Sequence, residues 1–333
     1  MLVACLAANV SDMAFARVRG PGHPDQLCDL VAASIVEEYA KRDSATRINV
    51  RVTGGQGVMF VAGEVQSSAD FDVSAVVRRV VALNSASDGI EPFIAFEPMA
   101  PAWAPDVGAR EPISVFGYAT DETPEMLPLS AALARRAADE LERLRTQDPE
   151  WFWLGSDVDV MVEDHRPNPL VLVRAEHNES VDVTTVRENI KTRLTSVLAQ
   201  VDVRVNVAGA EVAAGLAMRI GSSGVTSALD QYGTALPASP SGVGRHASHP
   251  TNIGAWLART VAKELVAQGK GKAVMVHSAW LPLESRAYLI KARNERGVDL
   301  SKEIDPVRFD LARIPASWRE PARVIASVRQ ALI

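Results

Sequence analysis

The stretch RGPGHPDQLCDLVAAS, from Arg19 to Ser34, places an imidazole and a carboxylate in a tight turn ahead of an apolar run with helical spacing. Pro24 suits the first position of a helix, where its missing N–H is no loss. Asp25 then offers a hard oxygen ligand for Mg²⁺ beside a helix N-terminus, which attracts phosphate. The alternative is that both residues are structural: His23 caps the turn, and the Asp25 carboxylate interacts favourably with the positive end of the helix dipole. Gln26 follows where a phosphate site would welcome a cation.

A second group of candidate residues lies in the Pro/Ser/Gly segment TALPASPSGVGRHASHPTN, residues 234–252, which we expect to form a loop over a site. Arg245 could clamp a phosphate through two parallel hydrogen bonds. His246 and His249, three residues apart, could form a metal or phosphate corner with it. Glu64 closes an apolar strand, where it is either a ligand or a solvated edge residue.

Composition limits the class of protein. The chain has 333 residues, 47% apolar and 23% charged, with a formal net charge of −6. This acidic balance argues against nucleic-acid binding, and no run approaches the ~20 apolar residues of a membrane span. Residues 1–13 are expected to be a disordered extension, with Met1 or Met13 as the start, and they lack the basic region of a secretory signal. Cys5 and Cys28 give no disulfide or metal pattern, so a cytoplasmic protein is expected.

The spacing of apolar residues predicts which elements position these candidates. The expected helices are 26–39, 72–83, 129–145, 181–199 and 253–267. The expected strands are INVRV, VMFVAGEV, VDVMVE, LVLVR, VDVRVNV, 273–278 and 286–291. Residues 84–115 are predicted to be a long connection, a kind that is often functional. The order of helix and strands, repeated three times, predicts an α+β fold of antiparallel sheets, each covered on one face by helices.

Three stretches together resemble the S-adenosylmethionine synthetase (methionine adenosyltransferase) family. GHPDQLCD is similar to the family's GHPDK opening, GVMFVAGEV to its strand ending in GE, and FGYATDETPEMLPL to its FGYATNET segment. Weaker matches, RAEH, DQYG, ARTVAKELVAQG and FDLA, follow in the family's order. The resemblance covers about residues 14–313.

The resemblance implies three pseudo-symmetric α+β domains, which we place at 14–105, 106–209 and 210–333. It also implies a homodimer whose flat sheets pack together and share two active sites. The implied reaction is attack of the methionine sulfur on C5′ of ATP, with departure of the whole triphosphate. Mg²⁺ assists it, because a leaving group of about four negative charges needs cations. The family's monovalent cation is in doubt for this chain.

Five residues match functional positions of the family. The resemblance implies that His23 steadies the departing ribose oxygen and that Asp25 holds magnesium. It places Glu64 at the methionine side of the pocket. Arg245 and His249 stand at two phosphate-binding lysine positions.

Other positions depart from the family pattern. Gln26 replaces the lysine after GHPD, and Arg219 falls on an aspartate that grips substrate. Glu111 replaces a metal-binding aspartate with a side chain one methylene longer. Met99 stands near a glutamine that contacts methionine. Arg51 falls on a glutamate of the monovalent-cation site, where its guanidinium could serve as a built-in cation.

Three hypotheses follow. The first is an enzyme of the family that uses Mg-ATP and transfers adenosyl to methionine or another nucleophile. The second is a hydrolase of nucleotides or polyphosphate that uses His23 and Asp25. The third is a catalytically reduced partner that regulates or stabilises a standard synthetase in a hetero-oligomer. Retention of His23, Asp25 and Glu64 favours the first, and loss of phosphate cations favours the third.

Overall fold

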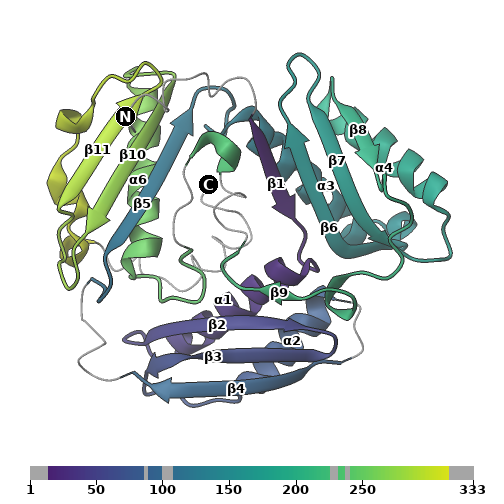
Figure 1. The fold of residues 1–333 in the computed structure, drawn as a ribbon, viewed down its shortest axis with the longest axis horizontal. Helices are drawn as coiled ribbons and strands as arrows, with labels where there is room; N and C mark the ends of the chain where they lie inside the picture. Colours follow the sequence, from purple (N-terminus) through teal and green to yellow (C-terminus); the bar gives the residue numbers. More distant parts are fainter. Residues whose placement is uncertain (1–13, 86–88, 100–107, 226–231, 237–240, 315–333) are drawn as a thin grey trace.

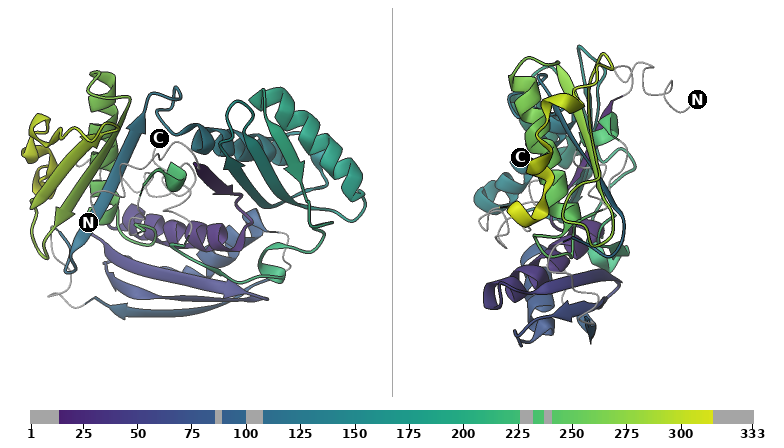
Figure 2. Two further views of the ribbon diagram at one scale, coloured as in Figure 1. Left: turned by 45° about the horizontal axis from the view of Figure 1, so that its top comes forward. Right: turned by 90° about the vertical axis from the view of Figure 1, so that its left-hand side faces the viewer.

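The computed structural model describes residues 14–85, 89–99, 108–225, 232–236 and 241–314. Within these residues the chain forms three β-sheets, each covered on one face by helices, arranged around a common centre (Figure 1). The view in Figure 1 looks onto the sheet faces that the helices leave uncovered. The side view in Figure 2 shows that the body is thin along this direction.

The first sheet follows the GHPD turn in sequence. Its strands, in spatial order, are β4 (Glu91–Pro98), β3 (Val58–Gln66), β2 (Arg47–Gly55) and β9 (Gly221–Ser222), and its helices are α1 (Pro24–Arg42) and α2 (Val73–Asn84). Along β2, Ile48, Val50 and Val52 are buried while the residues between them face outward, the period of two expected of a half-buried strand. The β3–β4 pair is parallel and the other pairs are antiparallel.

The second sheet and its helices enclose one of the three clusters of buried apolar side chains among the described residues. Its strands, in order, are β1 (Phe15–Arg19), β6 (Leu154–Glu163), β7 (Leu170–His177) and β8 (Asp202–Val205), and its helices are α3 (Leu129–Gln147) and α4 (Val183–Leu198). Val160 of β6 packs in one core with Leu141 of α3 and Ile190 of α4. The β7–β8 pair is parallel.

The third sheet is smaller. It contains β11 (Leu289–Asn294), β10 (Ala273–Trp280) and β5 (Ile113–Thr120), covered by α6 (Pro250–Ala267). Gly117 in β5 is required because a Cβ there would collide with the backbone of α6 at Ala258. Short 3₁₀ turns complete the described chain: η2 (Pro149–Trp151), η3 (Gly215–Ala217), η4 (Gly233–Ala235), η5 (Ser301–Glu303), η6 (Pro306–Phe309) and η7 (Leu311–Arg313).

The α+β prediction is confirmed, with helices at all five expected places. Four strands were not predicted: β1, β4, β5 and the two-residue β9. β4 lies within the expected long connection, and it is an edge strand, which is where a strand tolerates a proline such as Pro92. The sheets are antiparallel-rich rather than purely antiparallel, because each of the first two contains one parallel pair.

The sheets also exchange strands between distant parts of the sequence. β1 precedes the GHPD turn but pairs with β6 of the second sheet. β5 precedes α3 but pairs with β10 of the third sheet. Among the described residues, no helix is both long and apolar enough to span a bilayer.

Candidate active site

The GHPD turn is fastened to β6 and delivers its side chains at the start of α1. The N–H of Gly20 donates to the carbonyl of Val158 at 2.7 Å, and the N–H of Gly22 donates to that of Ser156 at 3.0 Å. A Cβ at Gly22 would collide with Ser156, so only glycine permits this close approach. The turn therefore fixes the position of the next residue, His23, against the second sheet.

His23 is the N-cap of α1 and is 5% exposed. Its Nδ1 accepts the N–H of Asp25 at 3.3 Å, and Pro24 occupies the first helical position as predicted. Burial lowers the pKa of His23 to about 4, so the ring is neutral near pH 7. Because Nδ1 is an acceptor, the proton of the neutral ring lies on Nε2, which is a hydrogen-bond donor.

Carboxylates of α1 hold the segment that contains β9. Oδ1 of Asp25 accepts the N–H of Ser222 at 3.0 Å. One turn later, Oδ1 of Asp29 accepts the N–H of Gly224 at 2.6 Å. Asp25 thus has a structural bond, and its Oδ2 lies 4.0 Å from Nδ1 of His23.

Arg245, His249 and Glu111 form a second group. The guanidinium of Arg245 pairs with Glu111 at 2.8 Å, and Nε2 of His249 lies 3.7 Å from the same carboxylate oxygen. His249 caps α6 and precedes Pro250, the same local arrangement that His23 and Pro24 adopt at α1. Burial, followed by the nearby His246 and the charge of Arg245, lowers the pKa of His249 well below its usual range.

Arg51 lies beside this second group. Its Nη1 donates to the carbonyl of Val243 at 2.6 Å. Burial and then the charge of Arg245 lower the pKa of Arg51, and the carboxylates of Asp29 and Glu111 partly offset this. The guanidinium therefore binds a carbonyl oxygen and lies in the electrostatic field of two acidic side chains.

Glu64 lies in the inner strand β3 of the first sheet, and Met99 directly follows the edge strand β4. Glu64 is exposed on the uncovered face and is in register with Asn49 of β2, which in turn bridges to Arg245. Met99 follows β4, and its N–H donates to the carbonyl of Val65 at 2.9 Å. The structure thus places Glu64 and Arg245 on either side of Asn49. His23 and Asp25 lie elsewhere, at the start of α1.

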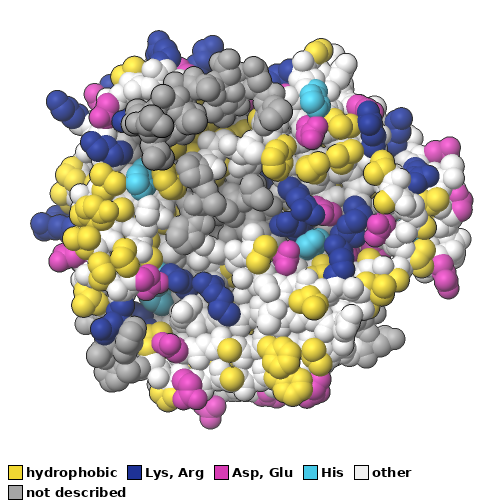
Figure 3. Space-filling view, in the orientation of Figure 1, with side chains coloured by type: hydrophobic (Ala, Val, Ile, Leu, Met, Phe, Trp, Pro, Cys, Tyr) yellow, Lys and Arg dark blue, Asp and Glu magenta, His cyan; other side chains and the backbone are white. Residues whose placement is uncertain are grey.

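Sequence reasoning singled out Arg219 but did not predict that it joins a set of arginines next to the GHPD turn. Arg17 and Arg19 of β1, Arg174 of β7 and Arg219 gather there with Asp157 and Asp159 of β6. Figure 3 shows dark blue and magenta side chains together on this part of the uncovered face. The only available signal was local: arginines two residues apart in FARVR face the same side of a strand.

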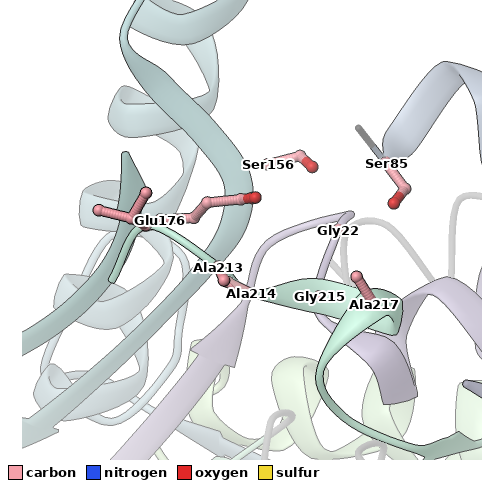
Figure 4. A pocket seen from close by; sticks show the side chains of 9 residues that line it. Gly22, Ser85, Ser156, Glu176, Ala213, Ala214, Gly215 and Ala217 are labelled. Carbon is pink, nitrogen blue, oxygen red and sulfur yellow. The ribbon is translucent and has the colours of Figure 1, made fainter. Parts of the chain in front are cut away.

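A cavity of about 150 Å³ opens beside the same turn (Figure 4). Its lining includes Gly22, Ser85, Ser156 and Glu176, together with small residues of the segment that contains Gly215. The Glu176 carboxylate accepts the N–H of Asp157 at 3.1 Å. Since the only charged side chain in this lining is acidic, the cavity does not suit a phosphate.

The donor set for a metal is sparse. Within the described ranges, no three His, Cys, Asp or Glu side chains form a group able to hold a metal ion. Asp25 and Glu111 belong to separate groups, and Glu111 is paired with Arg245. One carboxylate, Asp25, is compatible with the way Mg²⁺ is usually bound, through one or two carboxylates plus substrate phosphates.

Comparisons with known proteins agree with this geometry. Residues 15–87 match the model of the S-adenosylmethionine synthetase N-terminal domain, and residues 106–210 match that of the central domain. The chain is 28% identical over 314 residues to the S-adenosylmethionine synthase of Prochlorococcus marinus (strain NATL1A), covering 78% of this chain and 75% of that protein. It is 27% identical over 314 residues to the enzyme of the same name from Synechococcus sp. (strain RCC307), with the same coverage.

A solved structure of an unusual S-adenosylmethionine synthetase from Campylobacter jejuni superposes with a TM-score of 0.81 at 19% identity, over 94% of this chain and 93% of that one. The fold is thus the three-sheet α+β fold of that synthetase. Since the two matching domain models together span more than half of the chain, it belongs to the S-adenosylmethionine synthetase family, as a divergent member.

Proposed function

We propose that this chain is an enzyme that binds ATP with Mg²⁺ and transfers the adenosyl group to methionine or a related nucleophile, releasing the triphosphate. The observation that carries the proposal is His23: a buried, neutral imidazole whose Nε2–H remains a donor at the N-terminus of α1. A purely structural cap needs only the Nδ1 acceptor.

In the proposed reaction, a lone pair of the nucleophile forms a bond to C5′ of the ribose. The C5′–O bond breaks, and its electron pair leaves with the triphosphate. Nε2–H of His23 donates a hydrogen bond to the oxygen on which this charge develops, and the ring remains neutral throughout. The helix N-terminus behind it favours the same negative charge.

Asp25 is the residue that we propose as the protein ligand of Mg²⁺ in this site. The ion would supply neutralisation of phosphate charge. Asp25 keeps its Oδ1 bond to Ser222, which fixes the carboxylate on α1. Glu111, Arg245 and His249 are proposed for the phosphate end and Glu64 and Met99 for the acceptor end.

We propose that two copies of the chain complete each site. His23 and Asp25 lie at the start of α1, whereas Arg245 and His249 lie at the start of α6, and the proposed homodimer brings the two groups together across its interface. The uncovered sheet faces carry exposed apolar side chains suited to such contact, including the stacked rings of Phe60 and Phe93 at 5.1 Å. Domains at 14–105, 106–209 and 210–333 and a cytoplasmic location belong to the same proposal.

The direct test is detection of the adenosyl product and of triphosphate or its hydrolysis products with Mg-ATP and methionine analogues. Changing His23 to alanine should lower kcat about 10²-fold, the usual effect of losing one hydrogen-bond donor to a developing oxyanion. His165→Ala is the matched control, because His165 is exposed and pairs only with Glu163 among described residues. Equal rates for wild type and His23→Ala, with both folded, would contradict the assigned role.

A second candidate function is that of a catalytically reduced partner of a standard synthetase. The Glu111–Arg245 ion pair favours it, because each side chain occupies the other instead of metal or phosphate. Co-expression with a standard synthetase separates the two: mixed oligomers without adenosyl transfer by this chain support the partner role. Nucleotide or polyphosphate hydrolysis without adenosyl product is the third outcome of the same assays.

We also propose that the guanidinium of Arg51 takes the place of a bound monovalent cation. Wild-type activity should then be indifferent to K⁺ at constant ionic strength. The Arg51→Gln variant should lose about tenfold in rate, because one charge near phosphate contributes ~1–4 kcal/mol, and K⁺ should partly restore it. Arg78→Gln, at an exposed pair with Glu91, is the control. If K⁺ stimulated the wild type as much as Arg51→Gln, the proposal that Arg51 takes the place of a bound cation would be wrong.

A further inference from the structure

Four arginines lie together on the uncovered face of the second sheet; we call Arg17, Arg19, Arg174 and Arg219 the arginine face. Asp159 of β6 is in register with Arg19 of β1 on one side and with Arg174 of β7 on the other. Arg17 shares the face of Arg19 because side chains alternate along a strand. Arg219 reaches the same place from the segment that follows η3.

Acidic side chains beneath hold these guanidiniums in place. Asp157, whose side chain is fully buried, binds Arg174 at 2.6 Å, binds Arg219, and accepts the N–H of Gly215 at 2.7 Å. Asp159 forms two hydrogen bonds with Arg17. A guanidinium fixed by a buried carboxylate is preorganised, so less conformational entropy is lost when it binds a ligand.

The charges of the arginine face are balanced, but two of its guanidiniums are partly exposed. The four guanidiniums lie near four carboxylates: Asp157, Asp159, Glu176, which accepts the N–H of Asp157, and Glu211, at 3.5 Å from Arg174. The side chains of Arg17 and Arg219 each remain 37% exposed, so their heads lie at the surface. Arg219 makes one side-chain hydrogen bond among the described residues, to Asp157, out of the five that a guanidinium can donate.

The arginine face adjoins the GHPD turn. Arg19 and Arg219 both act on the buried ring of His23, as do Asp157 and Asp159. Gln26 supplies no positive charge next to Asp25. Arg19, at the end of β1, and Arg219 supply positive charge near the same turn instead. The cavity at Gly22 adjoins the arginine face, because its lining residues Glu176 and Gly215 both form hydrogen bonds with Asp157.

We propose that the arginine face binds the condensed-phosphate chain of the substrate. The planar guanidinium of arginine donates two parallel hydrogen bonds to the oxygens of a phosphate. Arg17 and Arg19 on β1 and Arg174 on β7 lie on either side of β6, or about 10 Å apart at the usual strand spacing, which suits a row of linked phosphoryl groups better than a single phosphate. The ligand class rests on the proposed function, whereas the residues are assigned from their geometry alone.

The test is calorimetric titration of the full chain with inorganic tripolyphosphate, with Mg-ATP and with orthophosphate. We expect tripolyphosphate to bind and orthophosphate to bind at least tenfold more weakly. Arg219→Gln should weaken tripolyphosphate binding about tenfold, whereas Arg219→Lys should keep most of it. Arg193→Gln on α4, whose partner is the Glu140 surface carboxylate, should bind like the wild type.

Arg17→Gln provides a second variant, since its loss leaves Asp157 and its two partners intact, and thermal unfolding checks that each variant is folded. Equal tripolyphosphate affinity in wild type, Arg219→Gln and Arg17→Gln would overturn the inference. Tripolyphosphate binding that depends on these arginines without adenosyl transfer would sink the proposed function and leave this inference standing. Binding of free tripolyphosphate but not Mg-ATP would identify inorganic polyphosphate as the source of the ligand.

Discussion

Replacing Arg259 by methionine should lower the free energy of unfolding by about 4 kcal/mol. Arg259 lies in α6, is 3% exposed, and donates hydrogen bonds to the carbonyls of Tyr118, Glu125 and Met126. It thereby clamps the FGYATDETPEM segment against the third sheet. The carbonyls of Tyr118 and Glu125 lose the Arg259 donor, whereas that of Met126 still accepts the N–H of Thr120 at 3.2 Å. Each carbonyl left without a donor costs about 1–3 kcal/mol, and burial of the apolar methionine offsets only part of the loss.

Urea denaturation of the metal-free chain measures this effect through the midpoint at constant m value. Arg259→Lys retains the charge but has no planar fork, so we expect an intermediate loss. The control is Arg143→Met, because Arg143 lies on the surface of α3 in an i,i+3 pair with Glu140 and such pairs contribute about 0–1 kcal/mol. If the urea midpoint of Arg259→Met equalled that of the wild type, the hydrogen bonds of Arg259 would not contribute to stability.

Acidification from pH 6.5 to pH 4 should destabilise the chain by at least about 3 kcal/mol. The pKa of His23 is lowered from 6.5 to about 4 by burial, and burial also lowers the pKa of His249. A histidine with a lowered pKa is neutral when folded and takes up a proton when it unfolds. Its stabilising contribution is therefore complete above pH 6.5 and is lost as the pH falls toward the folded value. Each such group contributes about 1.4 kcal/mol per pH unit over that window.

Unfolding free energies measured across this range, with a chelator present, test the expectation. His23→Asn keeps an N-cap acceptor but does not titrate, so its stability should fall less steeply with acid than that of the wild type. His165→Gln should leave the slope unchanged, because the His165 side chain is 64% exposed. A His23→Asn slope identical to that of the wild type would show that His23 is not held neutral by burial.

Most of the fold followed from local patterns because long amphipathic helices have a strong period. Residue types alone placed Pro24 at the first helical position, and capping by His23 was one of the two interpretations of that turn. The missed strands had weak local signals: β1 is five residues long and β4 is an edge strand with a proline near each end. Their pairing depends on partners far away in the sequence, which a local pattern does not record.

The site was predicted only where its residues are neighbours in sequence. His23 and Asp25 fell together at one helix end. The convergence of Arg51, Glu111 and Arg245 depends on packing between segments that are far apart in the sequence, and only the family resemblance pointed to Arg51 and Glu111. The arginine face was missed because its two halves, in β1 and β7, become adjacent only when β6 is inserted between them.

The exchange of β1 and β5 has a consequence for modularity. A fragment excised at the boundaries suggested by sequence would leave the β6 and β10 edges bare, because the strand that pairs with each is contributed by an earlier part of the chain. Such bare edges invite aggregation. The three units are therefore bound to fold and unfold as one cooperative body, and recombination of single units between relatives would have to carry the donated strands along.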